Sequence, residues 1–136
     1  MTGATALLGI IELGSVCARQ RAINLDLFEQ LGALVTAGGI SRGDEQQLAA
    51  TACHRHAWHA ELWAQRAPSI PPVQFGGAFD RTVDRYRGSL AVVAKSSDYR
   101  AAAGVLRGEL TELLGRVDPL LDPSTTRTIN LVLGDL

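Results

Sequence analysis

The sequence lacks the usual signs of β-structure and most of the short motifs that identify an enzyme class. It has no alternating run of β-branched residues, no Asn-Gly or Asp-Gly turn, no repeat and no low-complexity tract, so strands and hairpins are not predicted. It also has no Gly-rich phosphate loop and no Cys-x-x-Cys pair, which leaves nucleotide binding and dithiol chemistry without support. These absences predict an all-α protein.

The sequence also lacks an excess of charge of one sign and a long apolar run. Thirteen Lys and Arg stand against fourteen Asp and Glu, and the arginines are spread over all predicted helices, so no nucleic-acid partner is expected. No segment reaches the roughly 18 apolar residues of a membrane span, so no membrane partner is expected. The apolar start has no basic residues before it and contains Glu12, which favours a helix over a secretory signal. The two cysteines are expected to be reduced, and the predicted location is cytoplasmic.

The length and composition fit a single domain over residues 1–136. With 46% hydrophobic and 20% charged residues, the chain has enough apolar side chains for one ordinary core. Glycine pairs, prolines and capping residues predict four main helices and a short fifth. The simplest arrangement is an up-down four-helix bundle with a long N-terminal helical hairpin and a short C-terminal helix. The approximate bounds are Ala4–Ala37, Ser41–Arg66, Ala78–Lys95, Asp98–Val117 and a last helix from Asp122 onward.

All three histidines and both tryptophans lie within residues 53–63, in the second predicted helix. Histidine is the side chain most readily used as a metal ligand or proton carrier near neutral pH, so any chemistry is expected here. A helical projection points His56 inward and puts His59 about 60° away, on the edge of the same face. His54 falls on the opposite side near Glu61, where an exposed pair is expected.

The first predicted helix carries polar residues in the middle of its apolar face, namely Gln20, Arg21 and Asn24. Folding the hairpin at its glycine-rich turn places Gln20 opposite His59 and Asn24 opposite His56. A buried polar group without a partner costs roughly 1 to 3 kcal/mol, so polar residues that meet at one height should bond to one another, to water or to a ligand.

The sequence therefore predicts a polar pocket between the first two helices. Tyr86 is a further candidate from the third helix, whereas the apolar stripe of the fourth helix, which begins at Tyr99, is predicted to be purely structural. Cys17 and Cys53 both face inward but differ in height by about 13 Å, so a disulfide is not expected. The predicted pocket consists of Gln20, Arg21, Asn24, His56 and His59.

Two interpretations of the inward histidines remain open. His56 is either a core histidine bonded to amide or arginine partners, or a metal ligand together with His59. The i, i+3 spacing places both imidazoles on one side of the helix, but two ligands alone do not complete a zinc or iron site.

These motifs resemble the ferritin-like superfamily, especially bacterial branches similar to tRNA-hydroxylase-like proteins. The resemblance is carried by the inward His56-x-x-His59, the following Ala-Glu-Leu-Trp and the proline stop, and by residues 122–135, which are similar to the start of that family's last helix. The family implies two metals held by a Glu from the first helix, a Glu-x-x-His on the second and an equivalent set in the other half. His59 matches the histidine of that motif, and His56 occupies its glutamate position.

The sequence departs from the family in its carboxylates. Glu12 lies far from the apolar face of its helix and is expected in solvent. Gln20 and Asn24 stand where a carboxylate is needed, and amides are poor ligands for a di-iron centre. The chain ends at Leu136, where a second Glu-x-x-His is expected to begin, so either the chain is shortened or the second half-site does not exist.

The function expected from this resemblance is a binding or accessory protein with a partial histidine-centred polar or metal site. The alternative is a metal-dependent oxidoreductase or hydroxylase of the di-iron type, and a third reading is a structural or oligomerisation module; enzyme activity is left open. Iron, manganese and zinc are the metals considered for His56 and His59, and the small-molecule ligand is unknown. Apolar residues at the two chain ends need cover, so we expect them to pack together, either within one chain or between copies. These are Leu7, Leu8 and Ile11 at one end and Ile129, Val132, Leu133 and Leu136 at the other. The resemblance to ferritin-like hairpins favours a homodimer.

Overall fold

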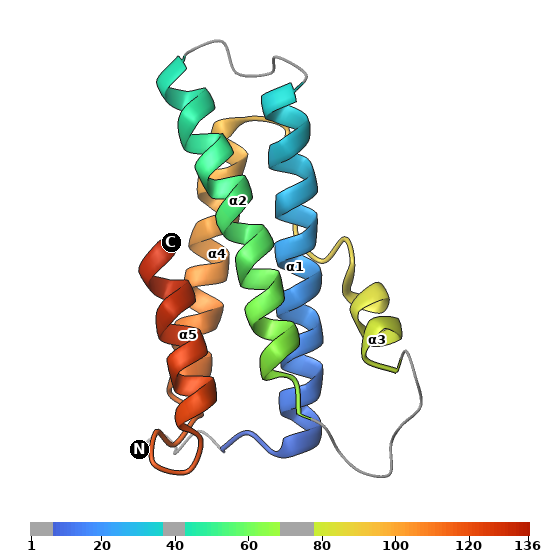
Figure 1. Cartoon of the computed structure of the whole chain (residues 1–136), viewed down its shortest axis with the longest axis vertical. Coiled ribbons are helices and arrows are strands. Elements are labelled where there is room, and N and C mark those ends of the chain that lie inside the picture. Colours follow the sequence, from blue (N-terminus) through green and yellow to red (C-terminus); the bar gives the residue numbers. More distant parts are fainter. Residues whose placement is uncertain (1–6, 37–42, 69–77) are drawn as a thin grey trace.

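The computed structural model describes residues 7–36, 43–68 and 78–136, and these ranges contain only helices and connecting segments. The predicted all-α class is therefore confirmed for the described residues. The helices are α1 (Ile10–Thr36), α2 (Gly43–Arg66), α3 (Ala78–Tyr86), α4 (Ser96–Leu114) and α5 (Pro123–Asp135). In Figure 1 the helices labelled α1, α2, α4 and α5 lie side by side, and α3 lies on the outer side of α1.

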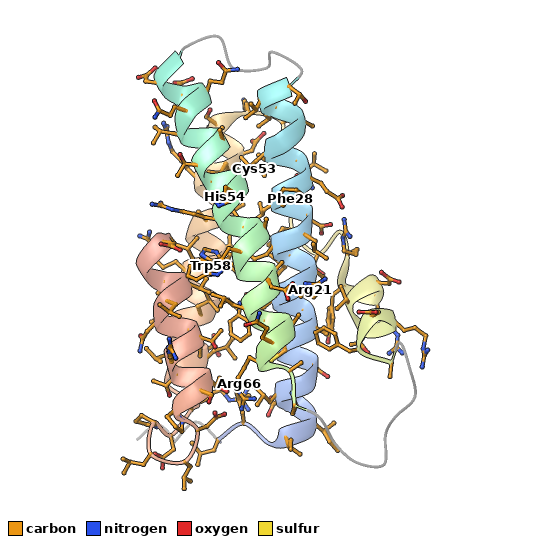
Figure 2. The ribbon with its side chains drawn as sticks, in the orientation of Figure 1. Arg21, Phe28, Cys53, His54, Trp58 and Arg66 are labelled. Atoms are coloured by element: carbon orange, nitrogen blue, oxygen red, sulfur yellow. The ribbon has the colours of Figure 1, made fainter. Side chains whose placement is uncertain are left out.

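The first two helices form an antiparallel hairpin, as expected (Figure 1). Arg21 reaches from α1 to α2, where its Nη1 donates to the carbonyl of Ala60 at 3.1 Å (Figure 2). Farther along, the thiol of Cys53 donates to the carbonyl of Phe28 at 3.3 Å. These contacts place residues whose numbers sum to about 80 opposite one another, in agreement with the predicted fold of the hairpin.

Helices α4 and α5 lie beside this hairpin, and α5 packs against both α2 and α4. Asp122 caps α5, where its carboxylate accepts from the backbone N–H of Thr125 and Pro123 occupies the first turn. Arg66, at the end of α2, donates to Asp122 at 3.0 Å and to the Thr125 hydroxyl at 2.7 Å. This polar junction ties the start of α5 to the end of α2 (Figure 2).

The core lies where α1, α2, α4 and α5 face one another. Each fully buried large apolar side chain contributes roughly 1.5 to 3 kcal/mol relative to exposure. Trp63 is the largest of them, with no exposed surface. The other large apolar residues below 2% exposure are Ile23, Leu27, Leu31, Leu106, Leu110, Ile129 and Val132.

The third helix is shorter than predicted, because it ends at Tyr86 and not at Lys95. Gly88 has a backbone φ of +81°, a left-handed conformation that ends a helix and favours glycine. Asp26 of α1 then holds the chain, since its carboxylate accepts from the Gly88 N–H at 2.7 Å and pairs with Arg87. The helical pattern of residues 87–95 is thus overridden by a glycine and a tertiary ion pair.

The other helix bounds also differ from the prediction. Helix α1 begins at Ile10, whereas Ala4 was predicted and lies outside the described residues, as does the expected cap Ser41. Leu8 lies before the helix and donates its backbone N–H to the Arg116 carbonyl at 3.1 Å. Helix α4 ends at Leu114 instead of near Val117. The helical periodicity of the sequence also predicts inward positions for Ile10, Phe28 and Leu48. In the structure all three are exposed.

The apolar side of α5 is covered within the chain. Ile129 and Val132 have no exposed surface, because they pack against the core shared with α2 and α4. Leu7 and Leu8 lie beside residues 116–122, at the other end of α5. Leu7 and Leu8 therefore lie beside the α4–α5 connection, whereas the predicted contact was with the apolar residues of the last helix. None of the helices in the described ranges is long and apolar enough to cross a membrane.

Candidate histidine-centred site

Both inward histidines are buried in the middle of the helix assembly. His56 is 1% exposed and His59 has no exposed surface, so His59 lies deeper than the predicted edge position. Their rings meet edge to face, with centroids 5.4 Å apart. His54 is exposed, as predicted. Trp58 is 45% exposed, and its ring centroid lies 5.8 Å from that of His59.

His56 uses both ring nitrogens in hydrogen bonds. The Asn24 amide nitrogen donates to the Gln20 carbonyl at 2.7 Å, which turns the Asn24 oxygen toward the imidazole. The Nδ1–H of His56 therefore donates to Asn24 Oδ1 at 2.7 Å, and Nε2 accepts from the Tyr99 hydroxyl at 2.8 Å. Burial lowers the pKa of His56 to about 3, so the ring is neutral at pH 7.

Tyr99 is a member of this site that the sequence analysis missed. It was assigned to a purely structural stripe of α4, and that assignment is wrong. Burial raises the pKa of Tyr99, so its hydroxyl keeps its proton and donates to His56. The available signal was the residue type, because a buried tyrosine hydroxyl usually finds a polar partner.

His59 is bonded on one side only. Its Nε2–H donates to the carboxylate of Asp135 on α5 at 2.8 Å, and Asp135 lies 4.0 Å from Arg55. The buried Nδ1 has no hydrogen-bond partner. Burial lowers the pKa of His59, with the Asp135 hydrogen bond acting in the opposite direction. A neutral His59 therefore presents a free lone pair at Nδ1.

Gln20 also joins the buried group, through a helix that was not expected to contribute. Its Nε2 donates to Glu109 of α4 at 2.8 Å, and Arg19 donates to the same carboxylate at 2.8 and 3.1 Å. The Gln20 Oε1 atom is buried without a partner, and so is the indole nitrogen of Trp63. The structure thus brings Asn24, His56 and His59 into contact, buries Gln20 one helical turn from Asn24, and adds Tyr99, Glu109 and Asp135 as bonding partners.

The remaining predicted pocket residues lie outside this group. Arg21 bonds the α2 backbone at the edge of the hairpin and lies 3.8 Å from Glu61. Glu61 therefore faces Arg21, while its expected pairing with His54 is not formed. Tyr86 belongs to a small cluster between α1 and α3, where the Arg19 guanidinium lies 6.0 Å from its ring centroid.

The residues present do not fit a two-metal carboxylate centre. Such a centre takes a glutamate from each of two helices and a Glu-x-x-His from each of the other two, whereas His56 and Gln20 hold glutamate positions here. Glu12 is on the surface, 2.8 Å from Arg116. The described residues contain no group of three or more His, Cys, Asp or Glu side chains arranged to hold a metal ion.

Two cysteines and one serine motif, which are residue types used in catalysis elsewhere, are separate from the histidine site. Cys17 and Cys53 are free thiols, as predicted, and burial raises the pKa of Cys17 to about 12, so it is unreactive at pH 7.

Residues 39–43, Gly-Ile-Ser-Arg-Gly, match the Gly-x-Ser-x-Gly pattern of serine hydrolases. That motif requires a strand before the serine, but here it follows helix α1, and Ser41 lies outside the described residues.

Comparisons of the chain with protein-family models, with curated proteins and with solved structures find no match. The interpretation of the site consequently rests on its own residues. Those residues form a buried polar group drawn from α1, α2, α4 and α5, in which the acceptor atoms His59 Nδ1 and Gln20 Oε1 have no hydrogen-bond partner.

Proposed function

We propose that this chain is a ferritin-like helical protein that acts as a binding or accessory protein through its buried histidine-centred site. Two observations support the scaffold assignment. The helices α1 and α2 form a hairpin, α4 and α5 lie beside it, and all four supply polar side chains to one interior group. Proteins of the ferritin-like type build their sites in this manner, from side chains on facing helices.

The observation that carries the proposal is the difference between the two histidines. His56 is committed to Asn24 and Tyr99 through both nitrogens, so it acts as a structural partner. His59 is held through Nε2 by Asp135 and keeps Nδ1 free. One oriented imidazole with one open nitrogen suits binding better than a di-iron reaction, which needs several carboxylates in place.

A metal-dependent oxidoreductase or hydroxylase is the alternative, and one contact favours it. Imidazoles that ligate a metal commonly donate their other N–H to a carboxylate, which fixes the ring. The Asp135–His59 bond has this form. The smallest metal site of this kind would hold iron, manganese or zinc at His59 and at a His56 released from Tyr99. Further ligands would have to come from residues outside the histidine site.

Metal analysis separates the two proposals. The protein is purified without chelator or affinity tag and its iron, manganese and zinc are measured by mass spectrometry. We expect less than about one tenth of an equivalent of each metal, and the same in the variant His59→Gln. A stoichiometric metal that disappears in His59→Gln but is retained in His54→Gln would establish the alternative and remove the proposal.

The expected homodimer and cytoplasmic location remain parts of this proposal. Ile11, Leu120 and Leu121 are 78%, 90% and 78% exposed, and the start of α1 and the α4–α5 connection lie at the same end of the molecule (Figure 1). Exposed apolar residues grouped in this way favour an interface between copies. The free cysteines are compatible with a reducing compartment. A structural or oligomerisation module remains the third reading, in which the histidine site has no ligand.

A further inference from the structure

Among the residues that the structure describes, three buried side-chain atoms have no hydrogen-bond partner, namely Gln20 Oε1, His59 Nδ1 and Trp63 Nε1. Each belongs to a side chain that is fully buried. An unpaired buried polar group costs roughly 1 to 3 kcal/mol, so such atoms are uncommon in a stable interior and need a partner.

The hydrogen-bonding character of the three atoms is set by their neighbours. The Gln20 amide must direct its N–H₂ group toward the Glu109 carboxylate, which only accepts, so its Oε1 is the free end. The neutral His59 carries its proton on Nε2, where it donates to Asp135, so Nδ1 is an acceptor. The indole N–H of Trp63 is a donor. The group therefore offers two acceptors and one donor.

The three side chains lie within about one helical turn of one another in height. Asn24 and His56 are bonded across the hairpin, Gln20 is one turn before Asn24, and His59 is one turn beyond His56, so Gln20 and His59 face each other. Trp63 is one further turn along α2. Helical side chains lean toward the N-terminus of their own helix, so in this antiparallel pair Gln20 and Trp63 lean toward each other.

We propose that Gln20, His59 and Trp63 bind one neutral molecule that donates two hydrogen bonds and accepts one, and that this molecule is water. Water donates to Gln20 Oε1 and His59 Nδ1 and accepts from Trp63 Nε1–H, so all three atoms are satisfied at once. Buried waters typically make about three hydrogen bonds of this kind. This inference does not depend on the chain being ferritin-like.

Other ligands fit the two acceptors and one donor of Gln20, His59 and Trp63 less well than water does. A metal cation would use the two acceptors but would face the indole N–H, which repels it. An anion would meet two lone pairs, and the nearby carboxylates of Glu109 and Asp135 would repel it further. Ammonium has no lone pair to accept from Trp63, and a simple alcohol has only one proton to donate.

Nuclear magnetic resonance of the full ¹⁵N-labelled chain tests the proposal. The indole N–H of Trp63 should show a direct cross-relaxation peak to a water that stays bound for longer than about a nanosecond. Trp58, which is 45% exposed, provides the control, because its indole should show only exchange with bulk water. The variant Gln20→Met should abolish or at least halve the Trp63 peak, whereas Gln65→Met, at an exposed position of α2, should leave it unchanged.

Two results would overturn the proposal. The first is a folded protein in which Trp63 shows no long-lived water. The second is loss of the peak, with a shift of the His59 nitrogens, on addition of one equivalent of Zn²⁺, which would assign the position to a cation. Metal-free protein with the Trp63 peak present supports the water site, whatever the outcome for ligand binding.

Discussion

At the scale of single residues, the site is a chain of hydrogen bonds whose directions are determined. Asn24 fixes the tautomer of His56, and that tautomer allows Tyr99 to donate. The order matters because each group then presents the one proton or lone pair that its neighbour needs. A change at any member leaves a buried atom unpaired on the next.

The hydroxyl of Tyr99 should therefore contribute to stability. We expect Tyr99→Phe to lower the free energy of unfolding by roughly 1 to 2 kcal/mol, because His56 Nε2 loses its donor in the interior. The matched change Tyr86→Phe, at a half-buried position between α1 and α3, should cost less than about 0.5 kcal/mol. Urea unfolding followed by circular dichroism measures both. Equal losses would show that the Tyr99 bond does not stabilise the fold.

Asn24 should be less replaceable than His56. The change Asn24→Leu keeps the imidazole but removes the acceptor of its Nδ1–H, and we expect a loss of roughly 1 to 3 kcal/mol. His56→Leu removes the imidazole and leaves Asn24 Oδ1 and the half-buried Tyr99 hydroxyl to find other partners, so the loss should be smaller. A larger loss for His56→Leu, suppressed by chelator, would point to a bound metal.

The two neutral histidines should make the protein sensitive to acid. Burial lowers the pKa of His56 to about 3 and also lowers that of His59, whereas an unfolded histidine has a pKa near 6.5. Between about pH 3 and pH 6.5 the unfolded chain binds more protons at His56 than the folded chain does, so stability is full above about pH 6.5 and falls as the pH drops toward 3, by up to about 1.4 kcal/mol per pH unit for His56. The lowered pKa of His59 acts in the same direction. Denaturant unfolding at several pH values should show a smaller slope in His56→Leu than in His54→Gln. An unchanged slope in His56→Leu would contradict this assignment.

At the scale of elements, the ends of the helices depend on residues with defined tasks. Asp122 both caps α5 and pairs with Arg66 of α2, and Gly88 ends α3 with a positive φ. Pattern and propensity predict the body of a helix, but such single residues decide where it stops.

Two glycines should respond to alanine with opposite signs. Gly88→Ala places a side chain at φ +81°, and we expect a loss of roughly 1 kcal/mol. Gly104 lies in the middle of α4, where an added Cβ meets nothing within 4 Å, so Gly104→Ala should stabilise by roughly 0.5 to 1 kcal/mol. Thermal unfolding of both variants tests the prediction. Stabilisation by Gly88→Ala would mean that the helix continues beyond Tyr86.

At the scale of the whole molecule, the apolar end formed by Ile11, Leu120 and Leu121 is the proposed contact between copies. We expect sedimentation equilibrium at tens of micromolar to show a dimer. Leu121→Glu should weaken it at least tenfold, because the introduced charge would be buried. Val92→Glu is the control, since Val92 is 72% exposed in the α3–α4 connection. A monomer at this concentration would remove the dimer from the proposal.

The sequence by itself determined the helical class, the hairpin and the meeting of Asn24 with His56. These features depend on local periodicity and on the turn that joins two neighbouring helices, and both are visible in the order of residues. The burial of His56 followed from the same pattern, because its helical face is also the face that carries Trp63.

Only the tertiary structure decided which residues from the second half of the chain bond to the buried site. Tyr99, Glu109 and Asp135 lie on α4 and α5, whose rotation and height relative to the hairpin depend on how all the helices pack, and no local periodicity encodes that. The same packing ended the third helix early, since the pairing of Arg87 and Gly88 with Asp26 joins residues about sixty positions apart. Contacts between distant segments thus decided which atoms of the histidine site are satisfied and which remain open.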